Sequence, residues 1–230
     1  MNRTYLLTLA AAGLALGASA ALAASGTSAR VRGTLSAVSA QSITVDTSAG
    51  SPVTVALTAK TAYLAVEKSS LAHIEKGSFI GTATKDVGGT QVALEVVVFP
   101  PAMRGTGEGH YAWDKIPDTT LSGNATTKSS MTNGNVSVVS SSPPDVKSSM
   151  TNGNVSATAA QGGVTHLTVT YQGGQQDVLV PPTAPIVTFH PGSAALLTKG
   201  RAVFVKATET ASGLVADAVA VGVDGVKPPM

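Results

Sequence analysis

The residues best suited to chemistry gather in one short stretch, Arg104 to Asp114. It holds the only Trp and several ionisable side chains, in a sequence of which only 12% is charged. Its three glycines allow the backbone to approach a ligand closely, and its two aromatic rings offer flat faces for contact. The candidate ligand-binding residues are Arg104, Glu108, His110, Tyr111, Trp113 and Asp114.

Two interpretations of this stretch stay open. In the first, it is a binding loop on a rigid scaffold, reached from solvent by a ligand or a partner. In the second, which we favour, it is an ordered connector. Trp113 and Tyr111 then fill the seam between two domains, and Arg104 pairs with Glu108 or Asp114.

Three residues of the stretch could also serve as metal ligands. Glu108, His110 and Asp114 carry donor atoms of suitable types. They lack the spacing of a zinc motif such as His-Glu-x-x-His, and the other histidines are isolated in the sequence. We therefore expect no cofactor, and a role in metal handling through these three residues is an alternative.

The sequence contains no strong catalytic motif. It has neither a Gly-x-Ser-x-Gly nucleophile elbow nor a phosphate-binding loop ending in Gly-Lys-Ser/Thr. Its 13 acidic residues are spread thinly, which gives poor support for a glycosidase pair. We expect no enzymatic activity, and a hydrolase built on the Arg104 to Asp114 loop is the second alternative.

The first 23 residues are expected to be a secretory signal peptide. Arg3 precedes an apolar run from Leu6 to Leu16, and Ala21-Leu22-Ala23 supplies the small residues of a cleavage site. Cleavage removes Arg3 from a formal net charge of only +2, and no basic cluster follows, which argues against nucleic acid as a partner. No later apolar run is long enough for a helical membrane span. We expect a periplasmic or secreted protein.

Segments rich in β-branched residues alternate with turn residues along the chain. Strands are expected within Val31 to Val45, Pro52 to Leu57, Phe79 to Thr84 and Gln91 to Phe99. A short helix is expected between Ser69 and Gly77. The order β-β-β-α-β-β is that of a five-stranded Greek-key barrel of the OB type.

The same order returns about 124 residues later. Its landmarks pair Ile43-Thr44-Val45 with Leu167-Thr168-Val169, Lys76-Gly77 with Lys199-Gly200, and Gly89 with Gly213. We therefore expect an all-β protein of two tandem five-stranded OB-like barrels, each with one short helix. The predicted boundaries are residues 24–99 for the first barrel, 100–146 for a connector, 147–223 for the second barrel and 224–230 for a tail.

A different repeat lies between the predicted barrels. Lys128 to Ser137 recurs identically as Lys147 to Ser156, at an offset of 19 residues that indicates a tandem duplication. One copy is surplus to a five-stranded barrel. We expect Lys147 to Thr158 to enter the second barrel. Thr126 to Asp145, interrupted by Pro143-Pro144, is expected to loop out or to pair weakly at an edge.

Four motifs of the mature chain suggest a family. They are Phe99-Pro100-x-Ala102-Met103-Arg104-Gly105-Thr106-Gly107-Glu108-Gly109-His110-Tyr111-x-Trp113-Asp114, Leu167-Thr168-Val169-x-Tyr171, Val180-Pro181-Pro182 and Gly222-x-Asp224-Gly225. Together they resemble a family of exported bacterial proteins of uncharacterised function with OB-like β-barrel domains, whose members are sometimes labelled metal ABC transporter permeases. The resemblance supplies no catalytic residues, and the segment from Lys128 to Asp145 departs from it.

The sequence as a whole favours an exported, non-enzymatic binding or structural protein of the cell envelope. The Arg104 to Asp114 loop would be presented to a ligand or to a protein partner. Because OB-type barrels bind oligonucleotides or oligosaccharides on one sheet face, an envelope glycan is the ligand class that we expect outside the cell.

Overall fold

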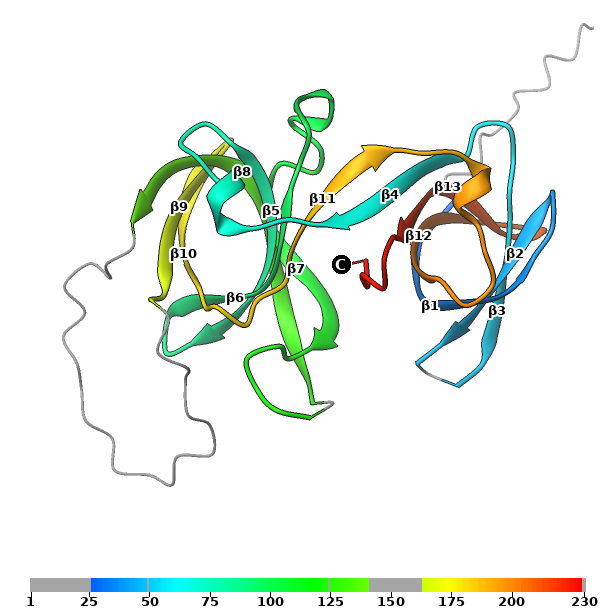
Figure 1. The fold of residues 1–230 in the computed structure, drawn as a ribbon, viewed down its shortest axis with the longest axis horizontal. Coiled ribbons are helices and arrows are strands. Elements are labelled where there is room, and N and C mark those ends of the chain that lie inside the picture. Colours follow the sequence, from blue (N-terminus) through cyan, green and yellow to red (C-terminus); the bar gives the residue numbers. More distant parts are fainter. Residues whose placement is uncertain (1–25, 49, 124, 141–162, 229–230) are drawn as a thin grey trace, which may run out of the picture.

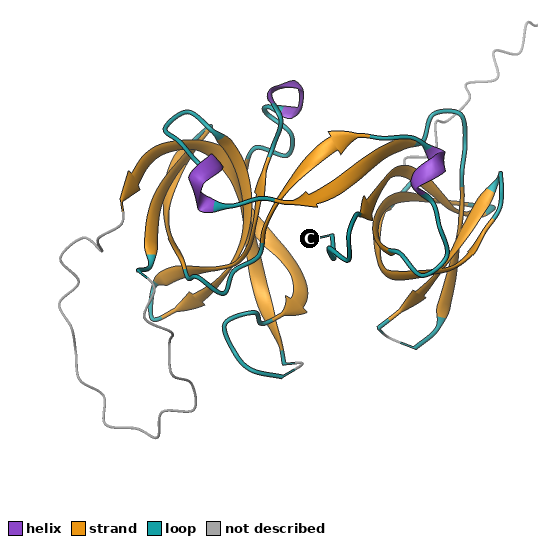
Figure 2. Cartoon of the chain, in the orientation of Figure 1, coloured by secondary structure: helices purple, strands orange, loops and turns teal. Residues whose placement is uncertain are grey.

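The computed structural model describes residues 26–48, 50–123, 125–140 and 163–228. In these residues the regular structure is β-strand, apart from three single-turn 3-10 helices (Figures 1 and 2). The predicted all-β class is confirmed. No helix in the described part of the chain is long and apolar enough to cross a membrane. The predicted signal peptide, residues 1–23, lies outside the described residues.

Thirteen strands are described. The first seven are β1 (Ser28–Val38), β2 (Ser42–Thr47), β3 (Pro52–Ala56), β4 (Ala62–Lys68), β5 (Phe79–Val87), β6 (Thr90–Val98) and β7 (Gly109–Pro117). The remaining six are β8 (Thr126–Ser140), β9 (Thr165–Tyr171), β10 (Gly174–Val180), β11 (Ile186–Pro191), β12 (Ala202–Thr210) and β13 (Gly213–Gly222).

Alternating burial explains why these segments are strands. In β2, Ile43 and Val45 are buried and Thr44 between them is not. In β9, Leu167 and Val169 are fully buried in the same pattern. A period of two residues places one apolar face on a core and leaves the other face to solvent.

Hydrogen bonding closes the strands into two circuits, which form the two lobes of Figure 1. The first circuit runs β1-β2-β3-β13-β12 and returns to β1. The second runs β5-β6-β10-β9-β8 and returns to β5. Between them, β4 and β11 pair with each other and connect β13 of one circuit to β6 of the other. All thirteen strands therefore belong to one continuous sheet.

The expected arrangement of two tandem barrels, each closed by consecutive strands, is not what the structure has. In the structure, β5 pairs with β8 and β6 pairs with β10, both in the second circuit. The strands that close the first circuit are β12, which pairs with β1, and β13, which pairs with β3. The physical reason is β4, which runs extended for seven residues and carries the chain out of the first circuit. The predicted ranges 24–99 and 147–223 thus each supply strands to both circuits.

The expectation that the first duplicated copy loops out or pairs weakly at an edge was wrong. That copy lies in β8, which pairs with β5, β7 and β9. Met131 and Val136 of this strand are almost completely buried, so the segment supplies apolar side chains that the second circuit needs. The segment expected to enter the second barrel, Lys147 to Thr158, contains the other copy and lies outside the described residues.

The two expected short helices are each a single 3-10 turn. They are η1 (Leu71–His73) and η3 (Ala194–Leu196), shown in purple in Figure 2. Ile74, directly after η1, packs in the core of the second circuit, and Leu196 packs against the core of the first. Gly77 and Gly200 follow the two turns with φ of +91° and +88°, a conformation that favours glycine and explains the repeated Lys-Gly.

Apolar side chains form a core in each circuit and a third between them. The core of the first circuit includes Leu35, Ile43, Val45, Val55 and Val205, and that of the second includes Ile80, Val96, Leu167, Val169 and Val178. In the third cluster, Phe99 lies 5.5 Å from Phe79 and 5.7 Å from Phe189, measured between ring centroids. The same cluster includes Ala220 of β13 and Val97 of β6, so apolar packing joins the two circuits around β4 and β11.

Candidate functional site at strand β7

The predicted loop follows the turn η2 (Pro101–Met103) and forms a glycine-rich bend and the first six residues of strand β7. Proline suits the first position of η2 because its missing N–H would have no helical partner. Gly105 and Gly107 have φ of +85° and +58°, so the bend needs glycine at both positions. Among the described strands, β7 pairs with β8 alone, and it lies at an edge of the sheet.

Asp114 forms ion pairs with two arginines of β1, on the other circuit. Its carboxylate accepts hydrogen bonds from Arg30 Nε at 2.9 Å and Nη2 at 2.8 Å, and from Arg32 Nη1 at 2.7 Å. The hydrogen bonds from Arg30, helped by Arg32, hold the pKa of Asp114 below its ordinary value, although partial burial opposes them. One carboxylate thereby fastens β7 to the first circuit.

Trp113 adds an aromatic contact to this ion-pair cluster. The guanidinium carbon of Arg30 lies 4.1 Å from the centre of the Trp113 ring, and Tyr111 meets the same ring edge to face at 5.9 Å. The indole also packs against a small apolar cluster that includes Leu94 and Met131. Its Nε1–H is buried and has no hydrogen-bond partner among the described residues. Trp113 is thus covered on several sides by protein.

The other polar residues of the stretch also contact the protein itself. Arg104 donates to the Gly77 carbonyl at 2.8 Å and to Asn135 Oδ1, so it pairs with neither Glu108 nor Asp114. Glu108 Oε1 accepts from the Gln172 backbone N–H at 3.0 Å.

His110 has a hydroxyl and an aromatic ring as neighbours. Its Nδ1 lies 2.8 Å from Thr132 Oγ1, and its ring stacks on Tyr171 at 6.4 Å. The imidazole is exposed, and Tyr171 is half-buried. His110 therefore lies at the surface where β7 and β9 come close.

The three proposed metal ligands are not brought together. Glu108 bonds to the chain after β9, His110 to β8 and Asp114 to β1. No group of three His, Asp or Glu side chains suited to a metal occurs in the described residues. The donor types predicted from the sequence are present, but they face different partners.

A nucleophile for hydrolysis is likewise not assembled at the loop. The hydroxyl beside His110 belongs to Thr132, which is fully buried within the sheet and out of reach of a substrate. An exposed pair that sequence analysis did not identify is Ser69 with His73, joined at 3.1 Å across η1. There Nδ1 faces the hydroxyl, whereas a catalytic triad uses Nδ1 to bind the orienting carboxylate.

Several partners of the loop were missed by sequence reasoning. Asn133 donates to the carbonyls of Thr106 and Gly107, which fixes the glycine-rich bend. Arg30 is 84 residues from Asp114, and no local pattern reports such a pairing. Only the low charge content of the chain could have suggested that its few arginines pair with its few carboxylates.

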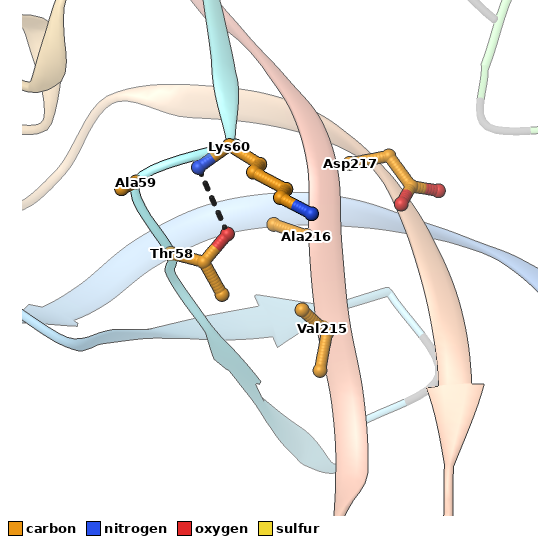
Figure 3. A pocket seen from close by; sticks show the side chains of 6 residues that line it. All are labelled: Thr58, Ala59, Lys60, Val215, Ala216 and Asp217. Carbon is orange, nitrogen blue, oxygen red and sulfur yellow. Dashed lines mark hydrogen bonds between the residues drawn. The ribbon is translucent and has the colours of Figure 1, made fainter. Parts of the chain in front are cut away.

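A shallow depression of about 560 Å³ lies elsewhere, between the β3–β4 connection and β13 (Figure 3). It is lined by Thr58, Ala59, Lys60, Val215, Ala216 and Asp217. Asp217 also accepts a hydrogen bond from Thr208 at 3.0 Å. Sequence analysis did not single out these residues.

Comparison of the chain with models of known families, with curated proteins and with solved structures found no match.

Proposed function

We propose that this chain is an exported, non-enzymatic binding protein of the cell envelope. The observation that carries the proposal is how the side chains of the predicted loop are used. Its charged groups hold β7 in place, while Tyr111 and His110 remain at the surface. A fixed strand that displays aromatic rings is suited to binding and has no group placed for bond cleavage.

The exposed rings indicate the class of ligand. Tyr111 is 38% exposed beside Trp113, and His110, also on β7, stacks on Tyr171 of β9. Flat rings with polar atoms at their rims suit the apolar faces and the hydroxyls of sugars. We infer an envelope glycan as the ligand.

The strand order supports this choice by analogy. We infer that each circuit is a small barrel of OB type. In the first circuit, β12 and β13 close on β1 and β3 and take the places that β5 and β6 would have in a barrel of consecutive strands. OB-type barrels bind oligosaccharides or oligonucleotides on one sheet face and its adjoining loops. Of the basic side chains near β7, Arg30 and Arg32 are engaged by Asp114, whereas Lys115 of β7 and Lys128 of β8 are exposed.

Calorimetric titration of the full chain with soluble peptidoglycan fragments tests this function. Tyr111→Ala should weaken binding by about tenfold or more, as expected for an aromatic residue at the centre of an interface. The matched control is Leu121→Ala, which removes an apolar side chain that is 47% exposed in the next loop and should leave affinity unchanged. Equal affinity of wild type and Tyr111→Ala would contradict the proposal.

A further inference from the structure

Strand β8 is built from a ten-residue segment that the sequence contains twice. Lys128–Ser137 and Lys147–Ser156 are identical, and the first copy lies in the sheet between β5, β7 and β9 (Figure 1). We propose that the place of β8 accepts either copy. The chain then exchanges between two pairings that differ by 19 residues. This inference is independent of the ligand proposed above.

The buried contacts of β8 come entirely from the duplicated residues. The buried positions are Ser129, Met131, Thr132, Asn133, Gly134 and Val136. Met131 packs in the cluster beneath Trp113, and Val136 is 1% exposed in the core of the second circuit. The second copy offers the same side chains at the same spacing, so it can make the same apolar contacts.

The polar contacts between β8 and the β7 segment are duplicated as well. They join Ser129 to the Asp114 carbonyl at 2.7 Å, Thr132 to His110 at 2.8 Å, Asn133 to the Gly107 carbonyl at 3.0 Å, and Asn135 to Arg104. All four side chains of β8 recur in Lys147–Ser156. Replacing one copy by the other thus preserves the contacts that position the candidate site.

Outside the ten residues, the copies differ at both ends of β8. Thr126 and Thr127, which are exposed and half-buried, correspond to Asp145 and Val146. Val138 and Val139 are 48% and 42% exposed, and the second copy has Ala157 and Thr158 at these positions. Changes at exposed positions usually alter stability by about 0.5 kcal/mol or less. The side-chain differences therefore do not select one copy strongly.

The connections also permit both pairings. With the first copy in place, residues 118–125 lead from β7 and residues 141–164 lead to β9. With the second copy, residues 118–144 would precede the strand and residues 160–164 would follow it, with Gly162-Gly163 suited to a tight turn. Because loop-closure entropy grows only with the logarithm of length, the longer and the shorter connection nearly compensate.

Three variants of the full chain test the exchange. Val136→Asp and Val155→Asp place a charge at the same position of the two copies, where burial of an unpaired carboxylate is not tolerated. Each single variant should keep a cooperative thermal transition, and the double variant should lose it. Val45→Asp, at an equally buried and unduplicated position, should also lose it. The proposal is overturned if Val136→Asp alone abolishes the transition.

A milder pair and a chemical readout complete the test. Val136→Ala should lower Tm far less than Val136→Ala combined with Val155→Ala, and equal shifts would contradict the exchange. Limited trypsin digestion should cut the copy that lies outside the sheet. We therefore expect cleavage after Lys147 in Val155→Asp and after Lys128 in Val136→Asp. Folding of Val136→Asp only as a dimer would show that another chain supplies the strand, and would overturn an exchange within one molecule.

Discussion

At the scale of single residues, Asp114 is the most informative position. Its carboxylate binds Arg30 and Arg32, and the guanidinium of Arg30 lies on Trp113. All three charged side chains are about a third exposed, so solvent screens the cluster and its contribution is modest. The cluster nevertheless orients the strand that carries the exposed aromatic rings.

Removing the charge of Asp114 should therefore make stability less sensitive to acid. The pKa of Asp114 is lower in the folded state than in the unfolded chain. Its contribution to the free energy of unfolding is therefore fully present above the ordinary carboxyl pKa, and it is lost as pH falls through the folded-state pKa. We expect Asp114→Asn to lower the free energy of unfolding at pH 7 by roughly 1 kcal/mol. Urea titrations between pH 7 and pH 3 should show a flatter pH dependence in this variant.

The matched control for that experiment is Asp46→Asn. Asp46 is exposed and forms no ion pair within the described residues. This variant should keep the pH dependence of the wild type. The account of Asp114 fails if Asp114→Asn follows the same pH curve as the wild type.

A second ion pair at the end of β7 is more deeply buried. Lys85 Nζ lies 2.8 Å from Asp118 Oδ2 and 2.6 Å from Thr120 Oγ1. Burial alone would raise the pKa of Asp118, but the hydrogen bonds from Lys85 and Thr120 outweigh it and hold the pKa below its ordinary value. Together with the hydrogen bond of Glu108 directly before β7, this pair anchors the strand at both of its ends.

At the scale of elements, close strand packing makes strict demands on one glycine of β1. A Cβ at Gly33 would overlap the backbone carbonyl of Asp46 in β2. Gly33→Ala must separate β1 from β2, and we expect it to lower the free energy of unfolding by about 1–3 kcal/mol. Thr34→Ala, at the exposed neighbouring position, should change it by about 0.5 kcal/mol or less in the same denaturant titration. A neutral Gly33→Ala would show that the two strands are not packed this closely.

Most of the strands could be predicted because each carries its own local signal. Alternating β-branched residues and turn glycines located β1, β2, β3, β5, β6, β9 and β12 closely. β7 was missed because its Gly, His and Trp residues resemble a binding loop rather than a strand. β4 was missed because its burial does not alternate: Ala65 and Val66 are buried in succession, so no period of two residues marks the strand.

For the candidate site, the sequence identified the segment but not its contacts. Composition alone singled out Arg104 to Asp114, since the side-chain types are local information. The partners Arg30, Asn133 and Gln172 come from distant parts of the chain. Such pairings depend on topology, which the local pattern does not contain.

At the scale of the whole molecule, the two halves are interlocked. The repeat predicted most of the strands that the two halves share, but neither β4 and β11 nor which half would pair with them. Both a consecutive and an exchanged arrangement satisfy the same alternation of buried and exposed residues. The structure selects the exchanged one, in which the pair β12–β13 closes on β1 and β3, and β5–β6 closes on β8 and β10.

Disulfide trapping tests this central claim most directly, because the chain has no Cys of its own. Ser28 of β1 faces Thr208 of β12 across an antiparallel pair, where Cα atoms are close enough for a disulfide. In a barrel of consecutive strands, β5 would pair with β1 instead of β12. Ser28 would then lie near Lys85, which is next to the residue that corresponds to Thr208 in the repeat. Mild oxidation should link Ser28→Cys to Thr208→Cys in the monomer, and leave Ser28→Cys with Lys85→Cys unlinked. The opposite pattern would contradict the exchanged fold.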